Sequence, residues 1–212
     1  MSVVRFRHGS PRLSSKNKGM PASVGSPFVL AININSGNIR MPFTPFHMGA
    51  ALIAKPVFNR HFSVITFGIA QIVMDIEPGI GMLTGAEVLH GPTHTILGAL
   101  GIAFLVSLIS PSLCKLVLKR WNKEIHFHRL LWLELPEVVS KATVIFSALF
   151  GTLSHVALDS LMHFDMHPLA PFSQANPLIG LISHDEIYQL CLVAGILGAI
   201  VWLILRWTGR AK

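Results

Sequence analysis

The chain has 212 residues, of which 51% are hydrophobic and only 13% are charged, against roughly 25% charged in a typical soluble domain. The formal net charge of +7 is concentrated in residues 1–40, which carry six basic side chains and no acid, so the rest of the chain is nearly neutral. These figures exclude an ordinary soluble enzyme, a disordered chain and a nucleic-acid-binding protein with a basic face. They favour an integral membrane protein built from several helices.

Residues 1–40 form a segment of their own, rich in Ser, Gly, Pro, Asn and basic residues. Three interpretations compete: a disordered native tail, an organellar targeting segment, or a stretch absent from the mature protein because translation begins at Met41. We expect a domain boundary at residue 40. Residues 41–212 then form one membrane-embedded domain.

Five apolar segments follow, at residues 44–58, 61–76, 93–118, 142–162 and 188–207. The last three have about 20 residues or more, enough to cross a bilayer core of roughly 30 Å. The first two are shorter, and the proline and glycine after Glu77 are expected to end the second. The third is one long apolar run, broken only by Ser110-Pro111. The expected fold is an all-α bundle of three clear transmembrane helices and two shorter apolar helices.

The basic side chains of residues 41–212 are distributed very unevenly. If the five segments run alternately up and down, all 11 Lys and Arg residues lie on the side of the turn at 55–60, the connection at 115–141 and the C-terminus. The opposite side has none. The bias of Lys and Arg towards the cytoplasm places the basic side there. The beginning of the domain then lies outside, where the basic tail would have to be translocated, which favours a start at Met41.

The chain has 11 histidines, and six of them lie at or near the non-cytoplasmic ends of the segments. These six are His47, His90, His94, His155, His163 and His184. Asp75 and Asp159 lie on the same side. One ionised carboxylate inside a membrane costs about 2.5–3.5 kcal/mol, so several need a compensating partner. A divalent metal is the simplest such partner, because it accepts both carboxylate and neutral imidazole.

The strongest pattern combines His155, Asp159 and His163 at positions i, i+4 and i+8 of an apolar segment. On a helix these side chains form one narrow stripe, with steps of about 6 Å along the axis. The stripe suits one metal ion, or two ions bridged by Asp159. It is also compatible with a polar stripe that binds a neighbouring helix, or with a water-filled cavity.

Further candidates come from the ends of the other segments. In His90-Gly-Pro-Thr-His94, the proline is expected in the first turn of a helix, which places His94 at the level of the cluster. Asp75 ends the second segment and His47 opens the first, and both are candidate ligands. Glu77 is a candidate for a positioning group or a catalytic base, and His163 is a second candidate for the base.

These motifs resemble a known family. Met41-Pro-Phe-Thr-Pro-Phe-His47, Asp75 after an apolar run, His90-x-x-Thr-His94-Thr and Ser154-His155-x-x-x-Asp159 are similar to those of the membrane-bound metal-dependent hydrolases of bacterial inner membranes, LexA-regulated type. The resemblance covers about residues 41–185. It implies metal positions at His47, Asp75, His90, His94, His155 and Asp159. A more distant similarity, to zinc-dependent phospholipase C, implies multinuclear zinc acting on phosphodiesters.

The expected function is therefore metal-dependent hydrolysis at the non-cytoplasmic face of a bacterial inner membrane. One or two divalent ions, with zinc preferred, would act on a lipid-like or phosphoester substrate. Membrane lipids are expected partners, nucleic acid is not, and no oligomeric state is predicted. Two alternatives from other classes are a metal-ion or proton transporter and a metal-stabilised scaffold without catalysis. Ionisable residues gathered at one end of the bundle favour a site that opens to a surface.

Overall fold

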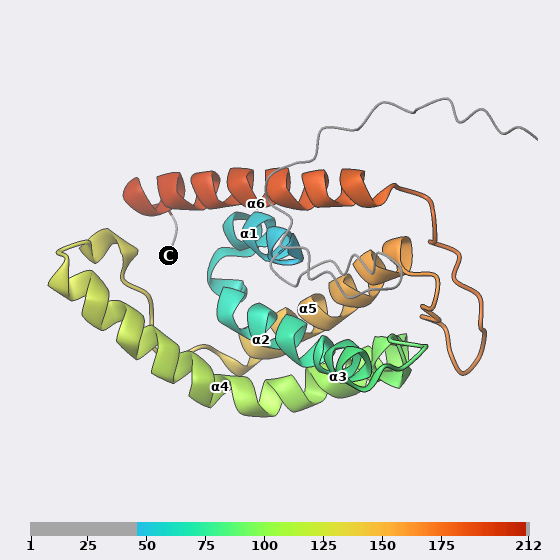
Figure 1. Ribbon diagram of the computed structural model, residues 1–212. Helices are drawn as coiled ribbons and strands as arrows, with labels where there is room; N and C mark the ends of the chain where they lie inside the picture. The colour runs from blue at the N-terminus through green and yellow to red at the C-terminus, as the bar shows by residue number, and fades with distance from the viewer. Residues whose placement is uncertain (1–45, 211–212) are drawn as a thin grey trace, which may run out of the picture. The chain divides into compact units, whose positions relative to one another are not determined.

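The computed structural model describes residues 46–210, and all regular secondary structure assigned in that range is helical (Figure 1). The α-helices are α1 (Met48–Phe58), α2 (Val64–Met74), α3 (Ile76–Thr84), α4 (Ile96–Phe127), α5 (Lys141–Met162) and α6 (His184–Trp207). The expectation of an all-α fold is confirmed for this range. The proposed tail at residues 1–40 lies outside the described residues.

Four stretches are long and apolar enough to cross a membrane, and the chain is on this basis an integral membrane protein. They are Val64–Thr84, Ile96–Phe127, Lys141–Met162 and His184–Trp207. The expectation of three clear spans is corrected to four, because α2 and α3 together make one candidate span. Pro78 does not end this segment. It is the third residue of α3, where a backbone N–H has no partner within the helix in any case.

The longest helix is α4, with 32 residues and a length of about 48 Å. The Ser110-Pro111 pair within the expected long segment does not end the helix, because α4 continues through Pro111 as a visibly curved helix (Figure 1). A proline inside a helix removes one backbone hydrogen bond and bends the axis without ending it when neighbouring packing holds both halves. Val106 and Cys114, on either side of the proline, are both fully buried.

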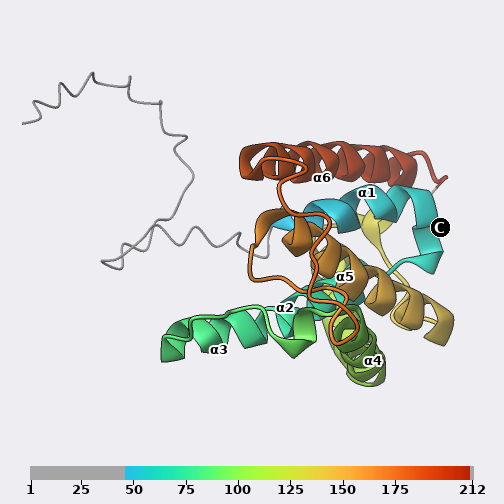
Figure 2. The ribbon, with the colours of Figure 1, turned by 90° about the vertical axis from the view of Figure 1, so that its right-hand side faces the viewer.

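The helices pack in layers, with α2 and α5 between α1 on one side and α4 on the other, and with α6 outside α1 (Figures 1 and 2). The contact between α1 and α6 depends on glycine. A Cβ atom on Gly49 would clash with the carbonyl oxygen of Cys191, and one on Gly198 would clash with the carbonyl oxygen of Leu52. These pairs also show that α1 and α6 run in the same direction.

One end of the bundle gathers most of the buried charge-bearing groups. Because successive segments alternate in direction when α2 and α3 are counted as one, α1, α4 and α6 begin near the end where α2 and α5 finish (Figure 1). The connection between α5 and α6 covers this end, and no helix is assigned from His163 to Ser183. Met166 of this loop is fully buried in the core, and the carbonyl of Pro168 accepts the N–H of Ile96 at 2.9 Å.

Candidate metal centre

All six residues expected to bind metal converge at this end of the bundle. His47 precedes the first turn of α1, Asp75 joins α2 to α3, and His155 and Asp159 lie on the last two turns of α5. His90 and His94 come from the connection before α4. Five of the six are almost completely buried, with exposed fractions of 2% for His47, 5% for His90, 1% for His94, 0% for His155 and 2% for Asp159.

Asp159 is at the centre of this group. Its Oδ2 lies 3.1 Å from Nε2 of His155, 3.6 Å from Nε2 of His94 and 3.9 Å from Nε2 of His90. Its Oδ1 lies 3.5 Å from Nε2 of His47. Two ligands at about 2.0–2.1 Å from a tetrahedral ion are about 3.3–3.4 Å apart, so these separations fit groups arranged around ions.

Asp75 contacts the cluster at His155, because its Oδ1 lies 3.4 Å from Nε2 of that ring. The carboxylate is about one-third exposed, unlike the other candidates. Asp75, His94 and His155 therefore form a further set of three side chains whose ligand atoms lie within 4.8 Å of one another.

Several of the convergent atoms have no hydrogen bond, although they are shielded from water. Within residues 46–210, Nε2 of His47, His94 and His155 and Oδ1 of Asp159 are buried and find no hydrogen-bond partner. A buried polar atom without a partner is rare and costs free energy. A divalent ion accepts lone pairs from imidazole nitrogen and carboxylate oxygen alike, so metal ions held by these groups would satisfy such atoms. The donor set thus fits a metal ion.

The outward-facing nitrogens of two histidines are held by acceptors. Nδ1 of His155 lies 2.7 Å from Oε1 of Gln71, whose own amide donates to the carbonyl of Gly151 at 2.8 Å. Nδ1 of His90 lies 2.9 Å from Oδ1 of Asp165. An oxygen acceptor at Nδ1 favours the tautomer that carries its proton there, and this is the form whose Nε2 has a lone pair for a metal ion. Metal-binding histidines characteristically have such an acceptor behind the ring.

The third such acceptor is Glu77. Its Oε2 lies 3.4 Å from Nδ1 of His94 and accepts the N–H of Thr93 at 3.1 Å and the Thr93 hydroxyl. Since Nδ1 and Nε2 are on opposite sides of the imidazole, Glu77 and Asp159 lie on opposite sides of His94. A Cβ atom on Gly91 would clash with Oε1 of Glu77, so the glycine leaves room for this carboxylate. Glu77 is therefore placed to position His94, and its role as a base stays a prediction.

His163 does not continue the stripe of His155 and Asp159. The last residue of α5 is Met162, and His163 has an extended backbone, so its side chain leaves the helical face. The expected single stripe of three ligands is corrected in this respect. The His163 ring instead stacks on His90 at a centroid distance of 4.3 Å, and its ligand atoms group with those of His90 and Asp165.

The segment before α4 also differs from expectation. Pro92–His94 is a 3₁₀ turn, and α4 begins only at Ile96 after Thr95, whose side chain accepts the N–H of Gly98. Pro92 thus opens the short turn and not the long helix. The turn still places His94 at the cluster, with Nε2 towards Asp159.

The candidate ligands form two groups that share Asp159. One is His47, His155 and Asp159, and the other is His90, His94 and Asp159, and in each the ligand atoms lie within 4.8 Å of one another. Asp159 faces His47 with Oδ1 and the histidines His155, His94 and His90 with Oδ2, and a carboxylate with both oxygens engaged in this way could serve two ions. The site therefore has room for one ion or for two.

Burial also keeps His47 and His94 in the neutral form that binds metal. Burial lowers the pKa of His94 to about 4, although the negative charge of Asp159 opposes this effect. Burial likewise lowers the pKa of His47 below its usual value. Both rings are neutral at pH 7, and neutral imidazole is the form with a lone pair to donate. For Asp165, burial raises the pKa, but the N–H groups of Leu89 and His90 and the His90 ring outweigh it, so the net pKa is lowered.

The sequence indicated the candidate ligands but not all of the side chains that contact them. Gln71 was not identified in advance, although it is a polar residue inside an apolar run and lies one helical turn before Asp75. That spacing is the signal that could have found it. No protein-family model, curated protein or solved structure matches this chain.

Proposed function

We propose that this protein is a membrane-bound metal-dependent hydrolase that holds one or two divalent ions, zinc by preference, and cleaves an ester or phosphoester bond of a lipid-like substrate. The observation that carries the proposal is the set of buried, partnerless Nε2 atoms that converge on Asp159. The acceptors on the opposite sides of three of the rings support it. The resemblance of the motifs to bacterial inner-membrane hydrolases agrees with this assignment.

The chain's own groups have distinct tasks in such a reaction. Asp159 and Asp75 provide negative charge, while Gln71, Asp165 and Glu77 hold the imidazole rings in orientation. When bound, a divalent ion supplies Lewis acidity towards the scissile group and lowers the pKa of water towards 7. His163 is half-buried beside His90 and its ring is not engaged by a carboxylate in the manner of His94. We therefore prefer His163 to Glu77 as the group that accepts a proton.

Charge distribution supports a location of the site on the non-cytoplasmic side. The C-terminal end of α4, the connection to α5 and the end of α6 carry basic residues, and the metal centre is at the other end of α5. Lys and Arg remain preferentially in the cytoplasm during insertion. Among the described residues, each set of side chains suited to a metal ion lies at this one end. This supports a hydrolase over a transporter, which needs such groups along the membrane depth.

The protein is purified in detergent and loaded with zinc. Its bound metal is then quantified by inductively coupled plasma mass spectrometry. We expect a stoichiometric amount of metal and a higher melting temperature after loading. Zinc-dependent cleavage is then measured with chromogenic acyl esters and with chromogenic phosphodiesters. Metal binding without cleavage of either class would favour the scaffold. A chain that binds no divalent ion and is not stabilised by zinc would overturn the proposal.

A further inference from the structure

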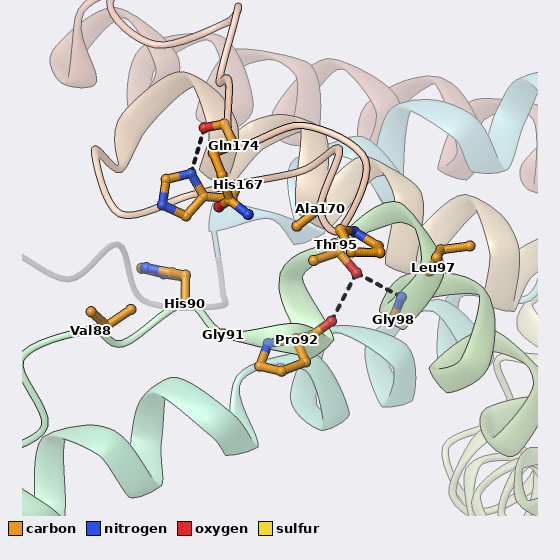
Figure 3. Close-up of a pocket in the computed structure, with 11 residues that line it drawn as sticks. Val88, His90, Gly91, Pro92, Thr95, Leu97, Gly98, His167, Ala170 and Gln174 are labelled. Atoms are coloured by element: carbon orange, nitrogen blue, oxygen red, sulfur yellow. Dashed lines mark hydrogen bonds between the residues drawn. The ribbon is translucent and has the colours of Figure 1, made fainter.

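A cavity of about 600 Å³ lies beside the metal centre, between residues 88–98 and residues 167–174 (Figure 3). Its volume is within the range of small-molecule binding sites, roughly 300–1,000 Å³. One wall comes from the segment that positions His90 and His94. The other comes from the loop that covers this end of the bundle after α5.

The walls of this cavity are mostly carbon. Val88, Pro92, Leu97, Ala170 and Pro171 contribute apolar surface. Such a lining suits an apolar ligand, with orientation set by a few polar groups.

Several polar groups in the walls already form hydrogen bonds with one another. The Thr95 hydroxyl donates to the carbonyl of Pro92 and accepts the N–H of Gly98, both at 2.9 Å. Nδ1 of His167 lies 2.7 Å from the carbonyl of Gln174. Because these groups satisfy one another, they need no hydrogen bond from a ligand, and an uncharged hydrocarbon can lie against them.

His90 connects the cavity to the metal centre. It lines the cavity, and its Nε2 lies 3.9 Å from Oδ2 of Asp159. Figure 3 shows His90 on the opposite side of the cavity from Leu97 and Gly98. A molecule in the cavity therefore extends from a polar end at the proposed site to an apolar end at the first turn of α4.

The apolar end adjoins the outer surface of a candidate membrane span. Leu97, Leu100 and Phe104 follow one another along α4 with exposed fractions of 50%, 43% and 64%. Side chains of this kind on a membrane-spanning helix face the acyl chains of the bilayer. A ligand can thus reach the cavity from the membrane itself.

We propose that this cavity binds one hydrocarbon chain of a membrane lipid and thereby places the ester or phosphoester bond of that lipid at His90. The inference rests on the hydrolase proposed above and names its substrate class. The loop at residues 167–174 is then a wall of the binding site, and Ala170 sets the width of the channel for the chain.

The test uses nanodiscs that contain a phospholipid with a photoreactive diazirine at the middle of one acyl chain. After illumination, the labelled peptides are identified by mass spectrometry. We expect label on residues 88–98 and 167–174 in addition to the outer faces of the spans. Ala170→Trp should fill the cavity and lower this label about fivefold or more, since a preformed pocket tolerates little extra volume. Ala175→Trp, an identical substitution at an exposed position of the same loop outside the cavity, should leave it unchanged.

Val88→Trp, at the other end of the cavity, is the second variant in case Ala170→Trp does not fold. Label confined to the outer faces of α4 and α6, or equal cavity label in the Ala170 and Ala175 variants, would overturn the inference. Each sample is measured with zinc and with a chelator. A chain that binds metal but shows no cavity label contradicts this inference alone. Cavity label in a chain that binds no metal contradicts the hydrolase and leaves the lipid-binding cavity intact.

Discussion

Nε2 of His155 lies 3.1 Å from Oδ2 of Asp159, one turn further along α5, and both side chains are buried in an apolar bundle. The other oxygen of the same carboxylate faces His47, from a helix that begins more than 100 residues earlier. Asp159 is thus the residue through which α1, α5 and the segment before α4 meet. Its two oxygens serve different histidines, which is why the loss of this single carboxylate should affect the whole centre.

Asp159→Asn keeps the volume of the side chain but removes its charge and its ability to bind through both oxygens. We expect zinc to bind more than about 100-fold more weakly, a larger effect than the 10- to 100-fold loss typical of residues that only support a ligand. Affinity is measured by competition with a chromogenic chelator. Asp185→Asn, at an exposed position in the first turn of α6, is the matched control and should bind zinc as the wild type does. Equal affinities of the two variants would remove Asp159 from the site.

Gln71→Leu tests the support behind His155. The substitution removes the acceptor for Nδ1, so the ring loses both its orientation and its preferred tautomer. We expect zinc affinity to fall by about 10- to 100-fold, with partial recovery in Gln71→Glu, which restores an acceptor oxygen. Gln189→Leu, on the exposed face of α6, makes the same chemical change away from the centre and should have no effect. A chain with Gln71→Leu that binds zinc normally would show that His155 needs no such partner.

Gly91→Ala tests the position of Glu77 without changing a charged residue. The added methyl group would clash with Oε1 of Glu77, so the carboxylate must move away from His94. We expect zinc binding to weaken by about tenfold, with no further loss when Glu77→Gln is combined with it. Gly79→Ala, in α3 with open space around the new methyl group, serves as the control. Fully additive losses in the double variant would indicate that the two residues act independently.

Gly49→Ala tests the close packing of α1 on α6. A methyl group there meets the backbone of Cys191, which cannot move aside as a flexible side chain can. The free energy of unfolding should fall by about 1–3 kcal/mol, the usual cost of overpacking. Gly101→Ala on the exposed face of α4 meets nothing and should be neutral or stabilising, by up to about 1 kcal/mol. Both values can be measured by unfolding in mixed micelles, and comparable stabilities of the two variants would contradict the packing described here.

Orientation in the membrane is tested with reporter fusions. Because every Lys and Arg residue of 41–212 is expected on one side, a reporter after Lys212 should be active in the cytoplasm. A reporter inserted between residues 170 and 180 should be active only on the other side. The reverse pattern would place the metal centre in the cytoplasm and would refute the proposed location.

Much of the local organisation could be predicted from the sequence, because it depends on short-range physics. Long apolar runs specify helices, and His47, Asp75, His90, His94, His155 and Asp159 could be assigned to one end of the bundle from their places along those runs. Alternation of helix direction then brings such positions to the same level. The continuation past Pro78 was missed, because a proline in a first turn costs little while one in the interior usually ends or bends a helix.

The tertiary structure alone decided which groups touch. Gln71 and Asp165 hold His155 and His90 from other elements, and nothing in their spacing along the chain specifies those pairs. His163 left the ligand stripe because α5 ends one residue before it, where local periodicity no longer applies. The parallel contact of α1 with α6 joins the two ends of the described chain. Such contacts depend on which helix faces pack together, and this is determined by the side-chain packing of the whole bundle.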